Sequence, residues 1–375
     1  MTTPARRASK TSRRTRDAAD AEAFLAADRL RRRGHPAEAA HAFGRILRRA
    51  PTHRAALKGL EASLRRLKRS ADAAKVAARR RATEADTLRR VAEFAADEGL
   101  TAVAAQCYVR IIRLDPKDRY AVWGLAQAMR RRGRLKEALR WYRRYQKLDP
   151  GEPESAHMVA ALAKARVPMR AADAYVKSVF DGFAEEFDKR LLEDLHYQAP
   201  DLLFENVTRV VGTPRRTLDV FDLGCGTGLA GIRFRRIARR LEGIDLSPKM
   251  VRYARKRRVY DRIEVGEMIA ALAGRRERYD LIVAADVFCY VGDLEPVIDA
   301  AAPALKSGGH LAFTVERRMK PGYAITRSGR YAHSPGYLRR CARHAGLREV
   351  RGRKVILRYE FGEPVWGHVA VMRKP

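Results

Sequence analysis

The residues best suited to do chemistry in this chain are a glycine-rich turn and an acid that follows it. A predicted strand over residues 217–223 leads into Asp222-Leu223-Gly224-Cys225-Gly226-Thr227-Gly228, with three glycines at alternate positions. Such glycines let the backbone turn sharply from strand to helix and let a ligand lie against bare main chain. Asp245 stands at the tip of the next predicted strand, where folds of this kind bind ribose hydroxyls. The pair predicts a site for a ligand that contains a ribose.

The glycine spacing identifies the type of ligand. In the dinucleotide fingerprint Gly-x-Gly-x-x-Gly the third glycine comes one residue later than Gly228 does here. The form Asp-x-Gly-x-Gly-x-Gly instead resembles motif I of the class I S-adenosylmethionine-dependent methyltransferases, and the rest of the set is most similar to those that act on small molecules. The resemblance implies a methyltransferase that uses S-adenosyl-L-methionine as its cofactor.

The resemblance also assigns roles around the turn. Asp222 is expected to orient backbone or to receive the methionine ammonium group. Gly224, Gly226 and Gly228 are expected to let that end of the cofactor lie on the turn. Asp245 is expected to accept hydrogen bonds from both ribose hydroxyls, which a carboxylate does well.

Three further cofactor contacts follow along the chain. Glu267 matches the acid that contacts the adenine amino group, although most relatives have Asp there, and Met268 packs either on the adenine face or in the core. Asp286, at the end of the fourth predicted strand, lies either beside the methyl sulfonium or simply at a strand end. The four cysteines lack the spacing of a metal or redox site, so we expect reduced thiols and no metal.

The acceptor side is expected between the fifth strand and a helix at residues 336–344. In this region, residues 329–335, we predict that Tyr331 contacts the substrate and that His333 does so as a possible general base. An amphipathic segment before motif I adds aromatic side chains that either pack in the core or close over the cofactor; they are Tyr175, Phe180, Phe183 and Phe187.

Strand and helix patterns alternate after motif I, which predicts a parallel sheet. The expected strands are 240–245, 262–265, 281–286 and 310–315, and two further strands near 347–361 and 365–372 would form a closing hairpin. Such a hairpin is similar to that of class I methyltransferases. The predicted fold class is therefore multidomain, with an α/β Rossmann-like methyltransferase domain at residues 172–375.

The preceding residues 19–165 are predicted to be helical and contain a repeat. Gly99, Ala104, Tyr108, Leu114, Asp115 and Pro116 recur 34 residues later, and an earlier copy keeps Gly34, Ala39, Phe43 and Pro51. This resembles the tetratricopeptide repeat, in which stacked helix pairs form a surface that usually docks proteins. We therefore expect an all-α repeat array with a protein partner, preceded by a disordered basic tail at residues 1–18.

The net charge of +34 is spread along the chain and is mostly arginine, with +20 up to residue 160 and +14 beyond it. A genome-wide arginine preference explains this, and an acidic partner or RNA is the alternative. No apolar run is long enough for a membrane span or a secretory signal, so we expect a cytoplasmic protein.

These observations lead to one main hypothesis and two alternatives. The main one is methylation of a small molecule or of a carrier-bound or protein-bound acceptor, with the repeats recruiting the substrate or a partner. No specific nucleic acid and no membrane partner is expected. The alternatives are an RNA methyltransferase that uses the arginine-rich surface, and an interaction scaffold whose methyltransferase half is inactive.

Overall fold

The computed structural model describes residues 19–163, 168–183, 188, 195–213, 215–360 and 363–375. The predicted basic tail, residues 1–18, lies outside this set. The chain divides into two compact units, Met1–Arg134 and Leu135–Pro375. The division therefore falls before the last predicted repeat ends, whereas the sequence pattern placed it between residues 165 and 172.

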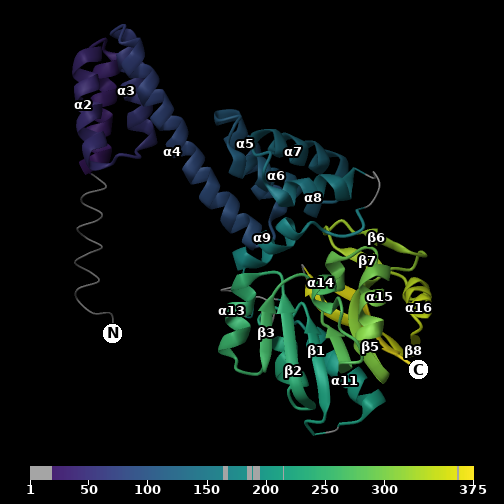
Figure 1. Cartoon of the computed structure of the whole chain (residues 1–375). Helices are drawn as coiled ribbons and strands as arrows, with labels where there is room; N and C mark the ends of the chain where they lie inside the picture. Colours follow the sequence, from purple (N-terminus) through teal and green to yellow (C-terminus); the bar gives the residue numbers. More distant parts are fainter. Residues whose placement is uncertain (1–18, 164–167, 184–187, 189–194, 214, 361–362) are drawn as a thin grey trace. The chain divides into compact units, whose positions relative to one another are not determined.

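The first unit is made of helices (Figure 1). A helix over residues 19–32 is followed by α2 (Pro36–Arg49), α3 (Arg54–Arg66), α4 (Ser70–Asp97), α5 (Thr101–Leu114) and α6 (Arg119–Arg131). An aromatic ring of one helix packs on a glycine of the next: a Cβ on Gly59 would lie 2.3 Å from the Phe43 ring, and one on Gly124 would lie 2.4 Å from the Tyr108 ring. The small residues are thus needed for close helix packing.

Helix α4 is twice as long as its neighbours, with 28 residues against 13 or 14. Other helix pairs are separated by a turn with proline, at Ala50-Pro51 and at Asp115-Pro116. No proline or glycine occurs within α4, so nothing stops the second helix of one repeat from continuing into the first helix of the next. The array is therefore irregular at α4, between the copy that begins at Gly34 and the copy that begins at Gly99.

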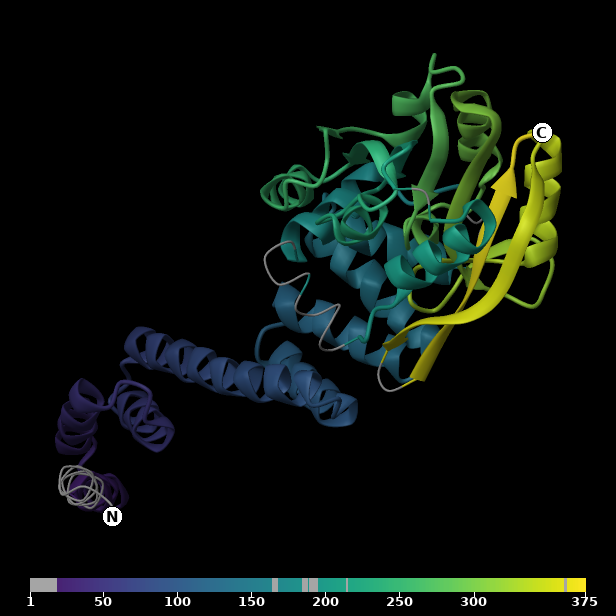
Figure 2. The same cartoon turned by 90° about the horizontal axis from the view of Figure 1, so that it is seen from below.

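The second unit begins with helices α7 (Leu135–Leu148), α8 (Pro153–Leu162), α9 (Asp173–Phe183) and α11 (Ala199–Val211). A sheet follows in the order β3-β2-β1-β4-β5, all parallel, formed by β1 (Leu218–Leu223), β2 (Ala238–Asp245), β3 (Arg262–Val265), β4 (Tyr279–Ala284) and β5 (Leu305–Arg317). The closing hairpin, β8 (Arg348–Glu360) and β9 (Glu363–Arg373), adds to β5 through an antiparallel β9, and its long strands are drawn in yellow in Figure 2.

A short strand pair was not predicted from sequence. Strands β6 (Tyr323–Ile325) and β7 (Tyr331–His333) extend the sheet at the end of β5, where β7 pairs with Glu316 and Arg317. Each has only three residues, too few to show a period of two. They carry the segment on which the acceptor side was predicted.

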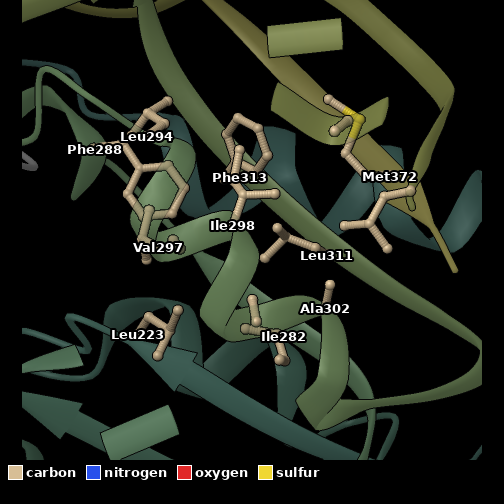
Figure 3. Close-up of a cluster of buried hydrophobic side chains, with 14 of the residues drawn as sticks. Leu223, Ile282, Phe288, Leu294, Val297, Ile298, Ala302, Leu311, Phe313 and Met372 are labelled. Atoms are coloured by element: carbon tan, nitrogen blue, oxygen red, sulfur yellow. The ribbon is translucent and has the colours of Figure 1, made fainter. Parts of the chain in front are cut away.

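Helices cover both faces of the sheet. On one face α15 (Glu295–Ala304) and α16 (Pro335–His344) pack over β1, β4 and β5, and Figure 3 shows part of this cluster, in which the rings of Phe288 and Phe313 lie 5.0 Å apart. On the other face α11 and α12 (Leu229–Phe234) pack against β1, β2, β4 and the hairpin. Because β1 to β4 are parallel and buried between these layers, their carboxyl ends meet at one edge.

Helix α8 packs against the α/β part of its unit. The ring of His157 stacks on Tyr175 of α9 with centroids 4.2 Å apart, and its Nε2 lies 2.7 Å from the carbonyl oxygen of Gly329. A Cβ on Gly329 would come within 2.9 Å of the Met158 sulfur. These contacts explain why α7 and α8 belong to the second unit.

We predict that a fragment of residues 135–375 is more stable than one of residues 171–375. Deleting α8 uncovers Tyr175 and the Gly329 carbonyl and removes the buried side chain of Met158, which costs roughly 2–5 kcal/mol. Thermal unfolding followed by circular dichroism should place the shorter fragment roughly 5–15 °C lower. Equal melting temperatures would contradict the assignment of α8 to this unit.

Candidate active site

A cleft of about 1170 Å³, counted to its open mouth, lies at the carboxyl edge of the parallel strands. Its floor is formed by the loops after β1, β2, β3 and β4. The segment 170–173, α9 and the start of α11 form a wall of the cleft. The lining residues that bear on function are Arg170, Tyr197, Gly224, Gly226, Asp245, Glu267, Met268, Asp286, Tyr290, Arg330 and Arg358.

The glycine turn forms one end of the cleft. Gly224 and Gly226 line it with φ angles of 67° and 54°, in the left-handed region that favours glycine. A Cβ on Gly224 would lie 2.6 Å from Val287, so the turn also approaches the loop after β4 closely. Gly228 does not line the cleft. It precedes α12 with φ 92°, and a Cβ there would press on Tyr260 and Arg257.

Asp245 lies in the cleft, fixed by backbone donors. Its Oδ2 accepts a hydrogen bond from Gly226 N and its Oδ1 accepts one from Ser247 N, both at 2.9 Å. Burial raises the pKa of Asp245, while these two hydrogen bonds act in the opposite direction. The carboxylate is thus held in one orientation at the strand end, with lone pairs left for a diol.

Asp222 lies behind the glycine turn and does not line the cleft. Its Oδ2 accepts a hydrogen bond from the Tyr260 hydroxyl at 2.7 Å, and its Oδ1 is buried without a partner within the described part of the chain. Burial raises the pKa of Asp222 to about 7. Asp222 therefore supports the glycine turn from below, which agrees with the first of its two predicted roles. Its side chain does not line the cleft in which the cofactor ammonium group is expected.

Glu267 and Met268, for which we predicted contact with adenine, both line the cleft. Glu267 begins helix α14 (Met268–Leu272), because its Oε2 accepts a hydrogen bond from Ala270 N at 2.9 Å. Its Oε1 accepts one from Arg170 Nη1 at 3.0 Å. Contact with the adenine amino group remains a prediction, and Arg170 is a neighbour that sequence reasoning missed.

Asp286 lines the cleft from the loop after β4, next to Val287, which approaches Gly224, and it has a strained backbone conformation with φ 58°. Its backbone N donates to Thr314 Oγ1 at 2.8 Å, and its two carboxylate oxygens accept from Arg358 Nη1 at 3.0 and 2.9 Å. Arg358 is only 1% exposed and also pairs with Glu360 and Glu316. The surroundings of Asp286 are thus a buried ion-pair network that holds its position.

Arg330 also lines this part of the cleft. Its Nη1 pairs with Glu360, and its side chain remains 26% exposed. Sequence reasoning missed both arginines. Arg330 lies in the segment 329–335, which the sequence analysis had assigned to the acceptor side. Arg358 directly follows the apolar run Val355-Ile356-Leu357, and a charged residue beside such a run is a signal of a paired buried charge.

The structure corrects the predicted roles of Tyr331 and His333. Both are fully buried, and neither lines the cleft. The Tyr331 hydroxyl donates to the Pro168 carbonyl at 2.9 Å, and His333 Nε2 lies 2.9 Å from the carbonyl oxygen of Gly292. Burial lowers the pKa of His333 to about 4. Residues of β7 alternate in direction and are covered by neighbouring loops, which a motif cannot show, so the residue of this segment that faces the cleft is Arg330.

The donor set of the cleft fits S-adenosylmethionine. The bare turn at Gly224 and Gly226 and the fixed carboxylate of Asp245 suit its amino acid and ribose parts, and Met268 supplies an apolar face for adenine. Of the predicted aromatic stripe, Phe180 lines the cleft and Tyr175 packs behind it. The Phe183 side chain and Phe187 lie outside the described residues.

Two further findings concern the residues that the structure describes. None of their helices is long and apolar enough to cross a membrane. Their His, Cys, Asp and Glu side chains form no group of three or more that could hold a metal ion.

Comparisons with protein families identify both parts of the chain. Residues 195–351 match the model of a methyltransferase domain, and residues 95–153 match the model of a tetratricopeptide repeat. The chain therefore contains a methyltransferase domain that follows a tetratricopeptide-repeat region, which confirms the predicted fold class and enzyme class. S-adenosylmethionine, the predicted cofactor, agrees with this domain family.

Curated relatives match only part of their length. The malonyl-[acyl-carrier protein] O-methyltransferase of Acetivibrio thermocellus is 34% identical over 99 residues, which cover 26% of this chain and 35% of that protein. The ubiquinone biosynthesis O-methyltransferase of Cupriavidus pinatubonensis is 31% identical over 154 residues, which cover 36% of this chain and 62% of that protein. The chain thus spans less than two thirds of the length of either relative.

A solved structure was also found to be similar. The magnesium protoporphyrin IX methyltransferase of Synechocystis, solved with S-adenosylhomocysteine, has 17% identity and a TM-score of 0.43, and the match covers 54% of this chain and 99% of that one.

We predict that Asp245→Ala weakens S-adenosylhomocysteine binding by at least about 100-fold. The change removes two charge-assisted hydrogen bonds to ribose, each worth roughly 1.5–3 kcal/mol. Calorimetric titration measures the loss, with Asp299→Asn, outside the cleft, as the control that should bind like the wild type. A wild-type protein that gives no heat would show that this cleft does not take the cofactor.

A second prediction concerns pH. The pKa of His333 is about 4 in the fold and about 6.5 when unfolded, so the unfolded chain binds one more proton between these values. This residue therefore lowers the stability by roughly 3 kcal/mol as the pH falls from 6.5 to 4, and contributes no pH dependence above 6.5.

The test compares urea unfolding of the wild type and His333→Gln at several pH values. Buried acids such as Asp222 act in the opposite direction in part of this range, so the quantity to measure is the difference between the two proteins. That difference should shrink as the pH falls, with His344→Gln on the protein surface as control. A constant difference would contradict a buried neutral His333.

Proposed function

Starting from the methyltransferase domain that this chain contains, we propose that it transfers a methyl group from S-adenosylmethionine to an oxygen atom of a small or carrier-bound acceptor. The observation that carries the proposal is a cleft that is lined both by the glycine turn and Asp245 and by Asp286, Tyr290 and Arg330. When bound, the cofactor supplies a methyl group on a positively charged sulfur.

The chain's contribution is binding and alignment. Methyl transfer is an in-line displacement with a good leaving group, so it depends mostly on holding the acceptor at the right distance and angle. Asp245 and the glycine turn fix one reactant. Asp286, held by Arg358, and the aromatic wall of Phe180 and Tyr290 border the place for the other.

Oxygen is proposed as the acceptor atom because both curated relatives described above are O-methyltransferases by name. One of them acts on a group attached to an acyl carrier protein. A carrier-bound acceptor is therefore part of the proposal, as is a cytoplasmic location.

Recruitment by the repeat region is supported by α8, which lies in the same compact unit as the cleft. Its His157 lies 2.7 Å from the carbonyl oxygen of Gly329, directly before Arg330. A partner bound to the repeats would thus be connected through α7 and α8 to the turn that borders the acceptor. This arrangement favours a protein or carrier partner over an RNA substrate that uses the dispersed arginines.

We predict that the fragment of residues 135–375 binds S-adenosylhomocysteine like the whole chain but uses its acceptor less efficiently. Loss of the first unit should raise KM for a carrier-bound acceptor at least about tenfold and leave kcat unchanged, because the cleft is intact. Labelled methyl transfer into fractions of a cell extract measures both proteins, with Gly226→Val as the inactive control. An unchanged KM would contradict recruitment, and labelled RNA as the main product would contradict the proposed acceptor.

A further inference from the structure

Arg330 gives the cleft a partly exposed guanidinium that is suited to bind a negative charge. Resting on the proposed function, we propose that the acceptor is a carboxylate, that Arg330 binds it, and that the product is a methyl ester. The proposal concerns the chemistry of the acceptor group, and it follows from how five charged side chains are divided between the cleft surface and the interior.

Each carboxylate of this network is paired with a guanidinium. Arg358 donates from Nη1 to both oxygens of Asp286, from Nε to Glu360 at 2.8 Å, and from Nη2 to Glu316. Burial raises the pKa of Glu316, so this acid takes up a proton more readily than usual. Glu316 and Glu360 are not lining residues of the cleft. The members of the network that line the cleft are therefore Arg330, Arg358 and Asp286, and the Asp286 carboxylate is engaged by Arg358.

Arg330 is the guanidinium that an acceptor can reach. Arg358 has a side chain that is 1% exposed, whereas that of Arg330 is 26% exposed and lines the cleft. Among the described residues, Nη1 of Arg330 forms an ion pair with Glu360 and lies 3.9 Å from a carboxylate oxygen of Glu316. A guanidinium offers five N–H donors in a planar fork that matches a carboxylate, so donors remain for a bound acid.

The turn that carries Arg330 is held rigidly. Gly329 N donates to the Thr326 carbonyl at 3.0 Å, and Thr326 N donates to the Arg330 carbonyl at 2.7 Å. On the other side His157 of α8 contacts the Gly329 carbonyl. The position of the Arg330 backbone is thereby set before any acceptor binds, which reduces the cost of ordering it on binding.

The titratable side chains that line the cleft also favour a carboxylate acceptor. An alcohol, a phenol or an amine must lose a proton when it is methylated, and this usually requires a positioned base. Of the described residues that line the cleft, none is a histidine, and the Asp286 carboxylate is occupied by Arg358. A carboxylate is already ionised at neutral pH and needs no such group.

The reaction balances without a further reactant. A carboxylate oxygen attacks the methyl carbon, the bond between that carbon and sulfur breaks, and its electron pair stays on sulfur. The products are a methyl ester and a neutral thioether, and no proton is released. The remaining wall is apolar, with Val176, Phe180 and Val291, so the body of the acid is expected to be hydrophobic.

The ester itself provides a test that does not require the acceptor to be known. The whole chain is incubated with S-adenosylmethionine labelled in the methyl group and with a small-molecule extract, and the product is then treated with alkali. A methyl ester releases its label as volatile methanol, whereas methyl ethers and methylamines retain it. Label that survives alkali would overturn the carboxylate proposal while leaving the methyltransferase proposal intact.

A binding experiment decides the case in which no labelled product forms. The protein saturated with S-adenosylhomocysteine is titrated with matched acids and amides, benzoate against benzamide and octanoate against octanamide. We expect the acids to bind at least about tenfold more tightly, and Arg330→Met to remove this preference. Equal binding of acid and amide, or tighter binding of benzylamine, would overturn the proposal.

The controls separate this inference from its premise. Arg330→Lys keeps the charge and should keep most of the preference for acids, and Arg327→Met, on the exposed part of the same turn, should behave like the wild type. All three variants should bind S-adenosylhomocysteine normally. If the wild type does not bind it, the proposed function fails, and if Arg330→Met binds it but still selects acids, only the assignment of Arg330 fails.

Discussion

The part of the cleft around Asp286 depends on one buried guanidinium. Arg358, on the closing hairpin, binds Asp286 after β4, Glu316 in β5 and Glu360 at the end of β8, so a single side chain joins three strands of the sheet. Removing it would leave three carboxylates close together in the interior, which is far more costly than a surface pair. The network also stabilises the left-handed backbone of Asp286, a conformation that persists only where its surroundings hold it.

The glycine turn depends on a different constraint, which is the close approach of the backbone segments around it. Gly224 meets Val287, and the Tyr260 ring lies against Gly231 and Gly243, where a Cβ would come within 2.3 and 2.9 Å of it. The Tyr260 hydroxyl then reaches Asp222 under the turn. Asp222 therefore acts in the layer beneath the cleft, while Asp245, fixed by Gly226 and Ser247, presents its carboxylate within it. Parallel strands bring the two acids together because their carboxyl ends lie on one edge.

The two halves of the chain are less separate than their families indicate. The tetratricopeptide match extends to residue 153, but the compact unit that contains the cleft begins at Leu135. Helix α7 thus belongs by family to the repeats and by packing to the unit that contains the cleft, and α8 begins at Pro153, where the family match ends. Since His157 and Met158 of α8 contact Gly329, the glycine at this position is required by that packing. The turn with Arg330 accordingly rests on a helix that directly follows the repeats.

The sequence by itself determined what local spacing encodes. The glycine turn, Asp245, the alternation of strands and helices along the α/β domain and the 34-residue helical repeat all follow from periods and motifs that span a few tens of residues. Only the tertiary structure decided which side chains face the cleft. Tyr331 and His333 are buried and Arg330 is not, although they are neighbours in one short segment, and Arg358 meets Asp286 across 72 residues of chain. The physical reason is that burial and charge pairing depend on what the rest of the fold places against a residue, which no local pattern records.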